Sequence, residues 1–94
     1  MNNTFELKFN KADTSVAGYP FGEKTFKEQV EGKIDYTQDI TIIFPDNIKM
    51  VASSFIQGFF ASIIQNIGLR GVEEFVTIKS SSERLSEKIK KNIR

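Results

Sequence analysis

Two adjacent serines, Ser53 and Ser54, are the residues of this chain whose type and position could most readily do chemistry. They begin a run in which apolar residues recur at three- and four-residue steps, and this spacing predicts a helix over residues 53–67. A serine at a helix start can cap free backbone N–H groups, and Ser54 and Gln57 have capping-box spacing. Such a serine can also carry a phosphate, because the positive end of the helix stabilises the added charge. We favour capping and keep a phosphorylation switch at Ser54, with Ser53 beside it, as the alternative.

The face of this helix away from its apolar stripe is unusual because it is small and uncharged. An ordinary exposed helical face carries Lys and Glu, whereas charge depletion and small residues are typical of interface cores. This face is either a partner interface, or it packs within the domain or forms a surface without a binding role. The candidate interface residues are Gln57, Gly58, Ala61, Ser62 and Gln65.

A second candidate surface is the basic C-terminal segment, with Lys88, Lys90, Lys91 and Arg94. These cations could bind phosphate backbones, but cations near a helix C-terminus are also favoured by the helix dipole. No aromatic side chain lies among them to stack on bases, and the net charge of the chain is only +1. We therefore favour a solvated helical face over a nucleic-acid site.

The chain has no Cys and no His, which excludes thiol nucleophiles, imidazole bases and the commonest transition-metal ligands. Its carboxylates are scattered through predicted turns and strand ends, and no glycine-rich phosphate loop is present. We expect no catalytic residues, no cofactor and no metal site, so the protein is predicted not to be an enzyme.

The remaining patterns predict an alternating α/β chain. Phe5, Leu7 and Phe9 alternate with polar residues, as in a strand with one buried face. A first helix is expected over residues 21–31, a central strand covered on both faces over 40–44, and a further strand over 72–78. Ser80 and Glu83, at capping-box spacing, then open a last helix.

The order β-α-β-α-β-α predicts a small single-layer sheet of three to four strands with about three helices. The strands at 40–44 and 72–78 should run parallel, because right-handed crossovers join them, whereas the direction of the first strand is not readable. We expect one domain, 1–94, with residues 1–3 flexible.

The N-terminus lacks the features of a signal peptide. The stretch from Met50 to Leu69 contains no charge, but its polar residues gather on one helical side, which a membrane-spanning helix does not need. We expect a cytoplasmic protein, and its richness in Ile, Lys, Asn and Phe favours a bacterial or phage source.

The segment from Ile48 to Phe60 combines the end of a buried strand, a turn, a serine pair and an apolar helix. It resembles the STAS-like family of unknown function, which is related to the sulfate-transporter and anti-sigma-factor-antagonist (STAS) domain. In those antagonists the second serine of such a pair is phosphorylated by a partner kinase, and the resemblance assigns that position to Ser54. This chain has Ala52 and Phe55 at the flanking positions, where the antagonists usually carry Asp and Gly.

We therefore predict a non-enzymatic regulatory or adaptor module. Helix 53–67 would bind a protein partner, such as a kinase-like regulator, or a second copy of the chain, with no membrane contact. The alternative is a nucleic-acid-associated accessory protein of a phage or mobile element that uses the basic C-terminal helix.

Overall fold

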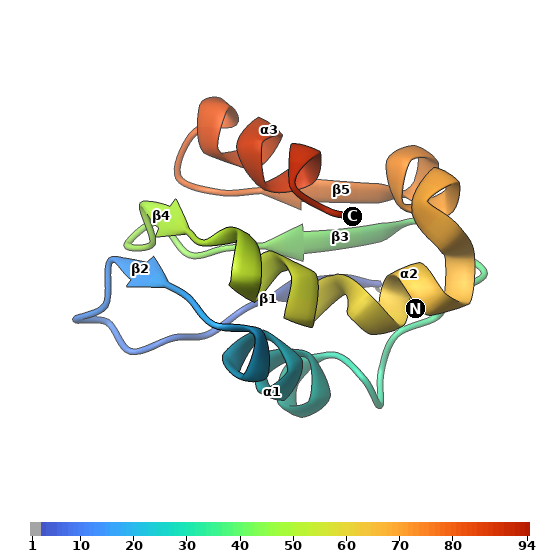
Figure 1. Cartoon of the computed structure of the whole chain (residues 1–94), viewed down its shortest axis with the longest axis horizontal. Coiled ribbons are helices and arrows are strands. Elements are labelled where there is room, and N and C mark those ends of the chain that lie inside the picture. Colours follow the sequence, from blue (N-terminus) through green and yellow to red (C-terminus); the bar gives the residue numbers. More distant parts are fainter. Residues whose placement is uncertain (1–2) are drawn as a thin grey trace.

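The computed structural model describes residues 3–94 and shows an α/β fold in which helices pack against a small sheet (Figure 1). The elements in chain order are β1 (Thr4–Glu6), β2 (Ser15–Val16), α1 (Tyr19–Gln29), β3 (Ile40–Ile43), β4 (Met50–Val51), α2 (Ser53–Phe75), β5 (Val76–Lys79) and α3 (Glu83–Lys91). The predicted alternation of three main strands with three helices is confirmed. Two short strands that the sequence did not indicate, β2 and β4, are added to it.

The main sheet has the order β1-β3-β5 and is parallel throughout. The predicted parallel pairing of β3 with β5 is confirmed, and β1 also runs parallel to β3. In both crossovers the chain moves one strand along the sheet through a helix, and Figure 1 shows α1 and α2 together in front of the strands. Helices α1 and α2 therefore share one face of the sheet, and α3 lies beside β5.

The core forms where this helix layer meets the sheet. The inward row of the sheet is Phe5, Ile42 and Ile78, which are in register across the three strands and are all buried. From α2, Phe55 and Phe59 stack on each other with ring centroids 5.9 Å apart. Both rings are fully buried, so α2 is the central helix of the fold.

Strands β2 and β4 form a separate parallel pair that fixes the start of α2. The Ala52 N–H donates to the Val16 carbonyl at 2.9 Å, and the Lys49 N–H donates to the Thr14 carbonyl at 2.7 Å. These bonds hold the entry of α2 beside the entry of α1, which begins three residues after Val16.

Helix α2 is longer than predicted, and the predicted strand at 72–78 is wrong over residues 72–75. The helix bends at Gly68, whose φ of 74° and ψ of 168° are not helical, and a second helical stretch then runs to Phe75. Phe75 and Val76 follow Val72 by three and four residues, and this spacing fits a helix as well as a strand. Val72 is buried from its helical position, so packing decided the assignment.

The prediction for the start of α3 is also corrected. The residue that caps this helix is Ser82, whose hydroxyl accepts a hydrogen bond from the Leu85 N–H at 3.1 Å. Ser80 lies outside the helix, and its hydroxyl is within 2.8 Å of the Ser82 carbonyl and 2.7 Å of the Ser86 hydroxyl. Three consecutive serines offered alternative caps, and the chain geometry selected the last.

The expected flexibility of residues 1–3 is corrected at Asn3, while Met1 and Asn2 lie outside the described residues. The Asn3 side chain is buried and donates to the carbonyls of Asp35 (2.8 Å) and Asp39 (2.9 Å). Its oxygen accepts from the Asp35 N–H at 3.0 Å. Asn3 therefore fastens the first strand to the loop that enters β3.

Strand β3 is covered on one face only, which corrects the prediction that both faces are covered. Ile40 and Ile42 are fully buried beneath the helices, whereas Thr41 and Ile43 on the opposite face are half-buried. On the neighbouring strands the residues of this opposite face are exposed. We call the set Thr4, Glu6, Thr41, Ile43, Thr77 and Lys79 the open face of the sheet.

Within residues 3–94, no helix is both long and apolar enough to cross a membrane.

Candidate functional site

The start of α2 joins the start of α1 through the Ser54 hydroxyl. This oxygen accepts a hydrogen bond from the Gly18 N–H at 3.0 Å, and Ser54 is half-buried. The N-cap residue of α2 is Ala52, and no side chain caps the helix. The predicted capping box of Ser54 and Gln57 is therefore wrong, because the Ser54 hydroxyl serves the N–H of another segment. Ser53, one residue earlier, is exposed.

Helices α1 and α2 cross at two glycines. A Cβ atom added to Gly58 would collide with the Tyr19 carbonyl group, lying 2.9 Å from its carbon. A Cβ atom added to Gly22 would collide with the Phe55 carbonyl and lie 2.7 Å from the Phe59 nitrogen. The two backbones touch, so Gly58 is buried inside the monomer and leaves the list of candidate interface residues.

The rest of the predicted neutral face divides into two parts. Gln57 and Gln65 are exposed and Ala61 is half-buried on the outer side of α2. Ser62 is half-buried one turn after Gly58, which places it on the side of α2 that faces α1. Helical spacing adds Ser53 to the outer side, and we call the resulting set the α2 ridge: Ser53, Gln57, Ala61 and Gln65.

The α2 ridge carries no charge at any position, because the chain has none between Lys49 and Arg70. Tyr19 flanks the ridge, since its backbone rests on Gly58, and its side chain is 42% exposed. Sequence reasoning missed Tyr19. The signal was an aromatic residue directly after Gly18, at the entry of a predicted helix.

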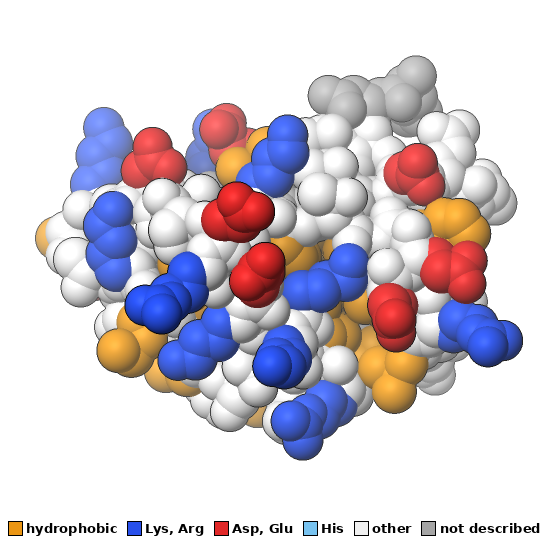
Figure 2. Space-filling model, turned by 90° about the horizontal axis from the view of Figure 1, so that it is seen from above, with side chains coloured by type: hydrophobic (Ala, Val, Ile, Leu, Met, Phe, Trp, Pro, Cys, Tyr) orange, Lys and Arg blue, Asp and Glu red, His pale blue; other side chains and the backbone are white. Residues whose placement is uncertain are grey.

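One of the four predicted basic residues, Lys90, makes hydrogen bonds within the fold. The Lys90 Nζ donates hydrogen bonds to the backbone carbonyls of Val76 and Glu73, the latter at 3.4 Å, so Lys90 fastens α3 to the end of α2 and the start of β5. Lys88, Lys91 and Arg94 are exposed. In Figure 2, which views the molecule from above α3, cationic and acidic side chains are interspersed on this side.

One small basic group does form around the exposed side chain of Met50, which is 62% exposed. Lys49, Arg84 and Lys88 line a shallow hollow of about 220 Å³ together with Met50. These cations come from the entry to β4 and from α3, so their proximity was not readable from the C-terminal segment alone.

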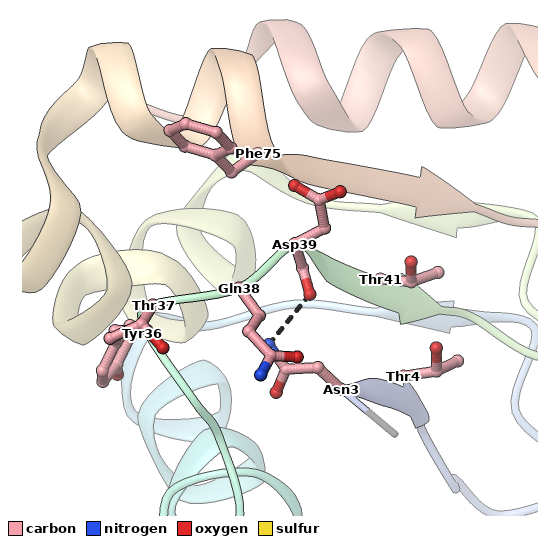
Figure 3. Close-up of a pocket in the computed structure, with 8 residues that line it drawn as sticks. All are labelled: Asn3, Thr4, Tyr36, Thr37, Gln38, Asp39, Thr41 and Phe75. Atoms are coloured by element: carbon pink, nitrogen blue, oxygen red, sulfur yellow. Dashed lines mark hydrogen bonds between the residues drawn. The ribbon is translucent and has the colours of Figure 1, made fainter. Parts of the chain in front are cut away.

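A larger hollow of about 580 Å³ lies at the amino end of the sheet (Figure 3). Its lining residues are Asn3, Thr4, Tyr36, Thr37, Gln38, Asp39, Thr41 and Phe75. Figure 3 shows Thr4 and Thr41 on adjacent strands, with Phe75 and Asp39 at the end of the hollow nearer β5. The carboxamide of Asn3 is already bonded to the main chain, so the polar groups open to this hollow are hydroxyls, the Gln38 amide and the Asp39 carboxylate.

Two pKa shifts occur in the loop that borders this hollow. The Thr37 hydroxyl, at 2.6 Å, and the Thr37 N–H, at 2.9 Å, donate to the Asp35 carboxylate and lower the pKa of Asp35. Burial raises the pKa of Tyr36, and the charge of Glu31 adds to this shift. Both shifts follow from the local structure of this loop.

Among the described residues, no three acidic side chains gather closely enough to hold a metal ion.

Comparisons with family models, with curated proteins and with solved structures give no match for this chain. The STAS-like resemblance therefore stays a prediction, and the surfaces described above are the features that indicate a function.

Proposed function

We propose that this protein is a non-enzymatic regulatory or adaptor module that binds a protein partner through the α2 ridge. The observation that carries the proposal is an exposed helical ridge without a single charge, running along the central helix of the fold. Depletion of charge is the compositional mark of interface cores, because burying an unpaired charge against a partner is costly. The STAS-like relationship and a cytoplasmic, bacterial setting belong to the same proposal.

Two features of the packing support a binding role. The glycine crossing of α1 and α2 holds the ridge rigidly, so a partner would meet a surface that is already ordered and would lose little entropy on binding. Tyr19, exposed beside the ridge, is of the residue type that most often anchors interfaces. Together they give an ordered neutral ridge with one aromatic residue at its margin.

A phosphorylation switch at the serine pair is the sharper form of this proposal. Ser53 is exposed at the first turn of α2, where a phosphate would meet free N–H groups and the positive end of the helix. The modified residue would add negative charge at one end of the neutral ridge and would weaken the binding of any partner that buries the ridge. At Ser54 the phosphate would also have to accommodate the hydrogen bond from Gly18.

The test compares a ridge variant with a matched control on α1. The double variant Gln57→Arg, Gln65→Arg places two charges on the ridge, and Glu28→Arg changes an exposed charge on α1. Each protein is immobilised and used to capture partners, and circular dichroism verifies the fold. We expect a protein captured by the wild type and by the control to be lost with the ridge variant.

The same capture, analysed by mass spectrometry, reports any phosphate on Ser53 or Ser54. Capture that the two ridge charges leave unchanged, in a correctly folded protein, would exclude the ridge as the binding surface.

Nucleic-acid binding is the competing proposal, and the cluster of Lys49, Arg84 and Lys88 is the observation that favours it. Phosphate contacts by these cations would make binding fall steeply with salt. In a mobility-shift assay at low salt, Lys88→Ala should weaken such binding, whereas the ridge variant should not. The absence of any shift at low salt would remove this alternative.

A further inference from the structure

The open face of the sheet is unusual for a parallel sheet. Parallel strands are found almost only in sheets with both faces covered, because their crossover helices normally flank the sheet on two sides. Here α1 and α2 cover the same face, and the opposite face is left to Thr41 and Ile43, half-buried at its centre, with exposed side chains around them. A covering layer is missing from the monomer.

The strand registers arrange this face in two straight rows. Thr4, Thr41 and Thr77 form one row across β1, β3 and β5. Glu6, Ile43 and Lys79 form the next row, so an acidic residue lies at one edge, an apolar residue at the centre and a basic residue at the other edge. Neighbouring strands are about 4.8 Å apart, so the two charges are separated by roughly 10 Å across the sheet.

This pattern is complementary to itself. A two-fold axis parallel to β3, lying between two sheets stacked face to face, exchanges the β1 and β5 edges and keeps each row opposite the same row. Glu6 of each copy then faces Lys79 of the other, and Ile43 faces Ile43. A two-fold axis along the rows would instead bring β1 over β1 and gather like charges. We infer that the open face binds a second copy of this chain in the first arrangement.

The hollow at the amino end of the sheet extends the contact. Thr4 and Thr41 form part of its lining, and Phe75, 48% exposed, lies at the end of it nearer β5 (Figure 3). The same two-fold axis places Phe75 of one copy over the β1 side of the partner's hollow. Each hollow, of about 580 Å³, thus receives an aromatic side chain from the other copy.

The contact is small, because six side chains and an aromatic anchor cover less than the roughly 800 Å² per partner of a standard interface. The dimer is therefore weak and dissociates on dilution. Its charge pairs lie at the rim, so salt also weakens it.

Charge reversal tests the arrangement by sedimentation equilibrium over a concentration series. Either Glu6→Lys or Lys79→Glu sets like charges against each other twice in the dimer and should raise the dissociation constant about tenfold or more. The double variant Glu6→Lys, Lys79→Glu restores both pairs and should return the constant to within about threefold of wild type. An equal mixture of the two single variants should form a heterodimer, because each supplies the charge that the other lacks.

Glu28→Lys, on the surface of α1, is the matched control and should leave the dissociation constant unchanged. A second readout is a photo-crosslinking residue in place of Thr77, which should link to a second copy of the chain. A wild type that stays monomeric at about 1 mM, where even a millimolar dimer is populated, would overturn the inference. Failure of the double variant to restore what the single variants lose would also overturn it, as would crosslinking from position 77 only to another protein.

Discussion

Replacing Gly58 with alanine should destabilise this protein although the change adds a single methyl group to a helix. Gly58 lies in the first half of α2, where an added Cβ would lie only 2.9 Å from the carbonyl carbon of Tyr19. Because the colliding atoms belong to the backbone of α1, no side chain can rotate away, and the whole helix must shift.

The expected magnitude follows from two opposing contributions. Overpacking of a well-filled interior costs about 1–3 kcal/mol, and a backbone neighbour places Gly58 at the upper end. Alanine regains about 1 kcal/mol from its higher helix propensity. The net loss is therefore about 2 kcal/mol, out of roughly 5–14 kcal/mol for a chain of this length. For a small domain this loss lowers the melting temperature by about 8–16 °C.

Urea unfolding followed by far-ultraviolet circular dichroism measures this loss. Gly32→Ala is the matched control, because a Cβ there meets nothing within 4 Å, and it should be neutral or slightly stabilising. Gly22→Ala should cost about as much stability as Gly58→Ala. The double variant should cost less than the sum of the two, because one shift of α1 away from α2 relieves both collisions. A stability of Gly58→Ala equal to wild type, or full additivity in the double variant, would refute the close backbone contact.

Three further predictions concern the start of α2 and the loop at the amino end of the sheet. Ser54→Ala leaves the Gly18 N–H without its acceptor and should cost about 1–2 kcal/mol in urea unfolding, whereas Ser53→Ala should be nearly neutral. Asn3→Ala removes three hydrogen bonds and should lower the free energy of unfolding by about 2–3 kcal/mol. The hydrogen exchange of the Asp35 and Thr41 amides should rise, and unchanged exchange there would contradict the fastening role of Asn3. Thr37→Val removes the main hydrogen bond that lowers the pKa of Asp35. A lowered carboxyl pKa stabilises the fold at pH values above the ordinary pKa of 3.8, and this stabilisation is lost as the pH falls through the lowered pKa. Thr37→Val should therefore be less stable than wild type near neutral pH and as stable as wild type in strong acid.

The elements that the sequence determined are those whose local pattern agrees with their packing. The run of Ile40 to Ile43 is a strand because it is β-branched and apolar, and the stripe from Phe55 to Ile63 is a helix because its spacing follows one helical face. The α/β class and the parallel pairing of β3 with β5 followed from the order of these elements, since crossover chirality restricts the topology.

The candidate surfaces were predicted only in part. Gln57, Ala61 and Gln65 lie on the outer side of α2 as the helical wheel indicated. Gly58 does not, because a residue without a side chain fits a close helix crossing as well as it fits a surface, and only the position of α1 distinguishes the two. The role of Lys90 was hidden for a similar reason, since its bonds go to backbone carbonyls that no sequence pattern marks.

Hydrophobic periodicity along the chain therefore determined the main helices and strands, because that information is local, whereas packing decided the state of residues 72–75 and the short strands β2 and β4. Tertiary structure alone decided which faces remain uncovered and which residues meet across the sheet. Glu6, Ile43 and Lys79 are more than thirty residues apart in sequence, and only the registers of β1, β3 and β5 set them in one row. Such a row depends on where strands pair, and pairing is fixed by the packing of the whole core rather than by any one segment.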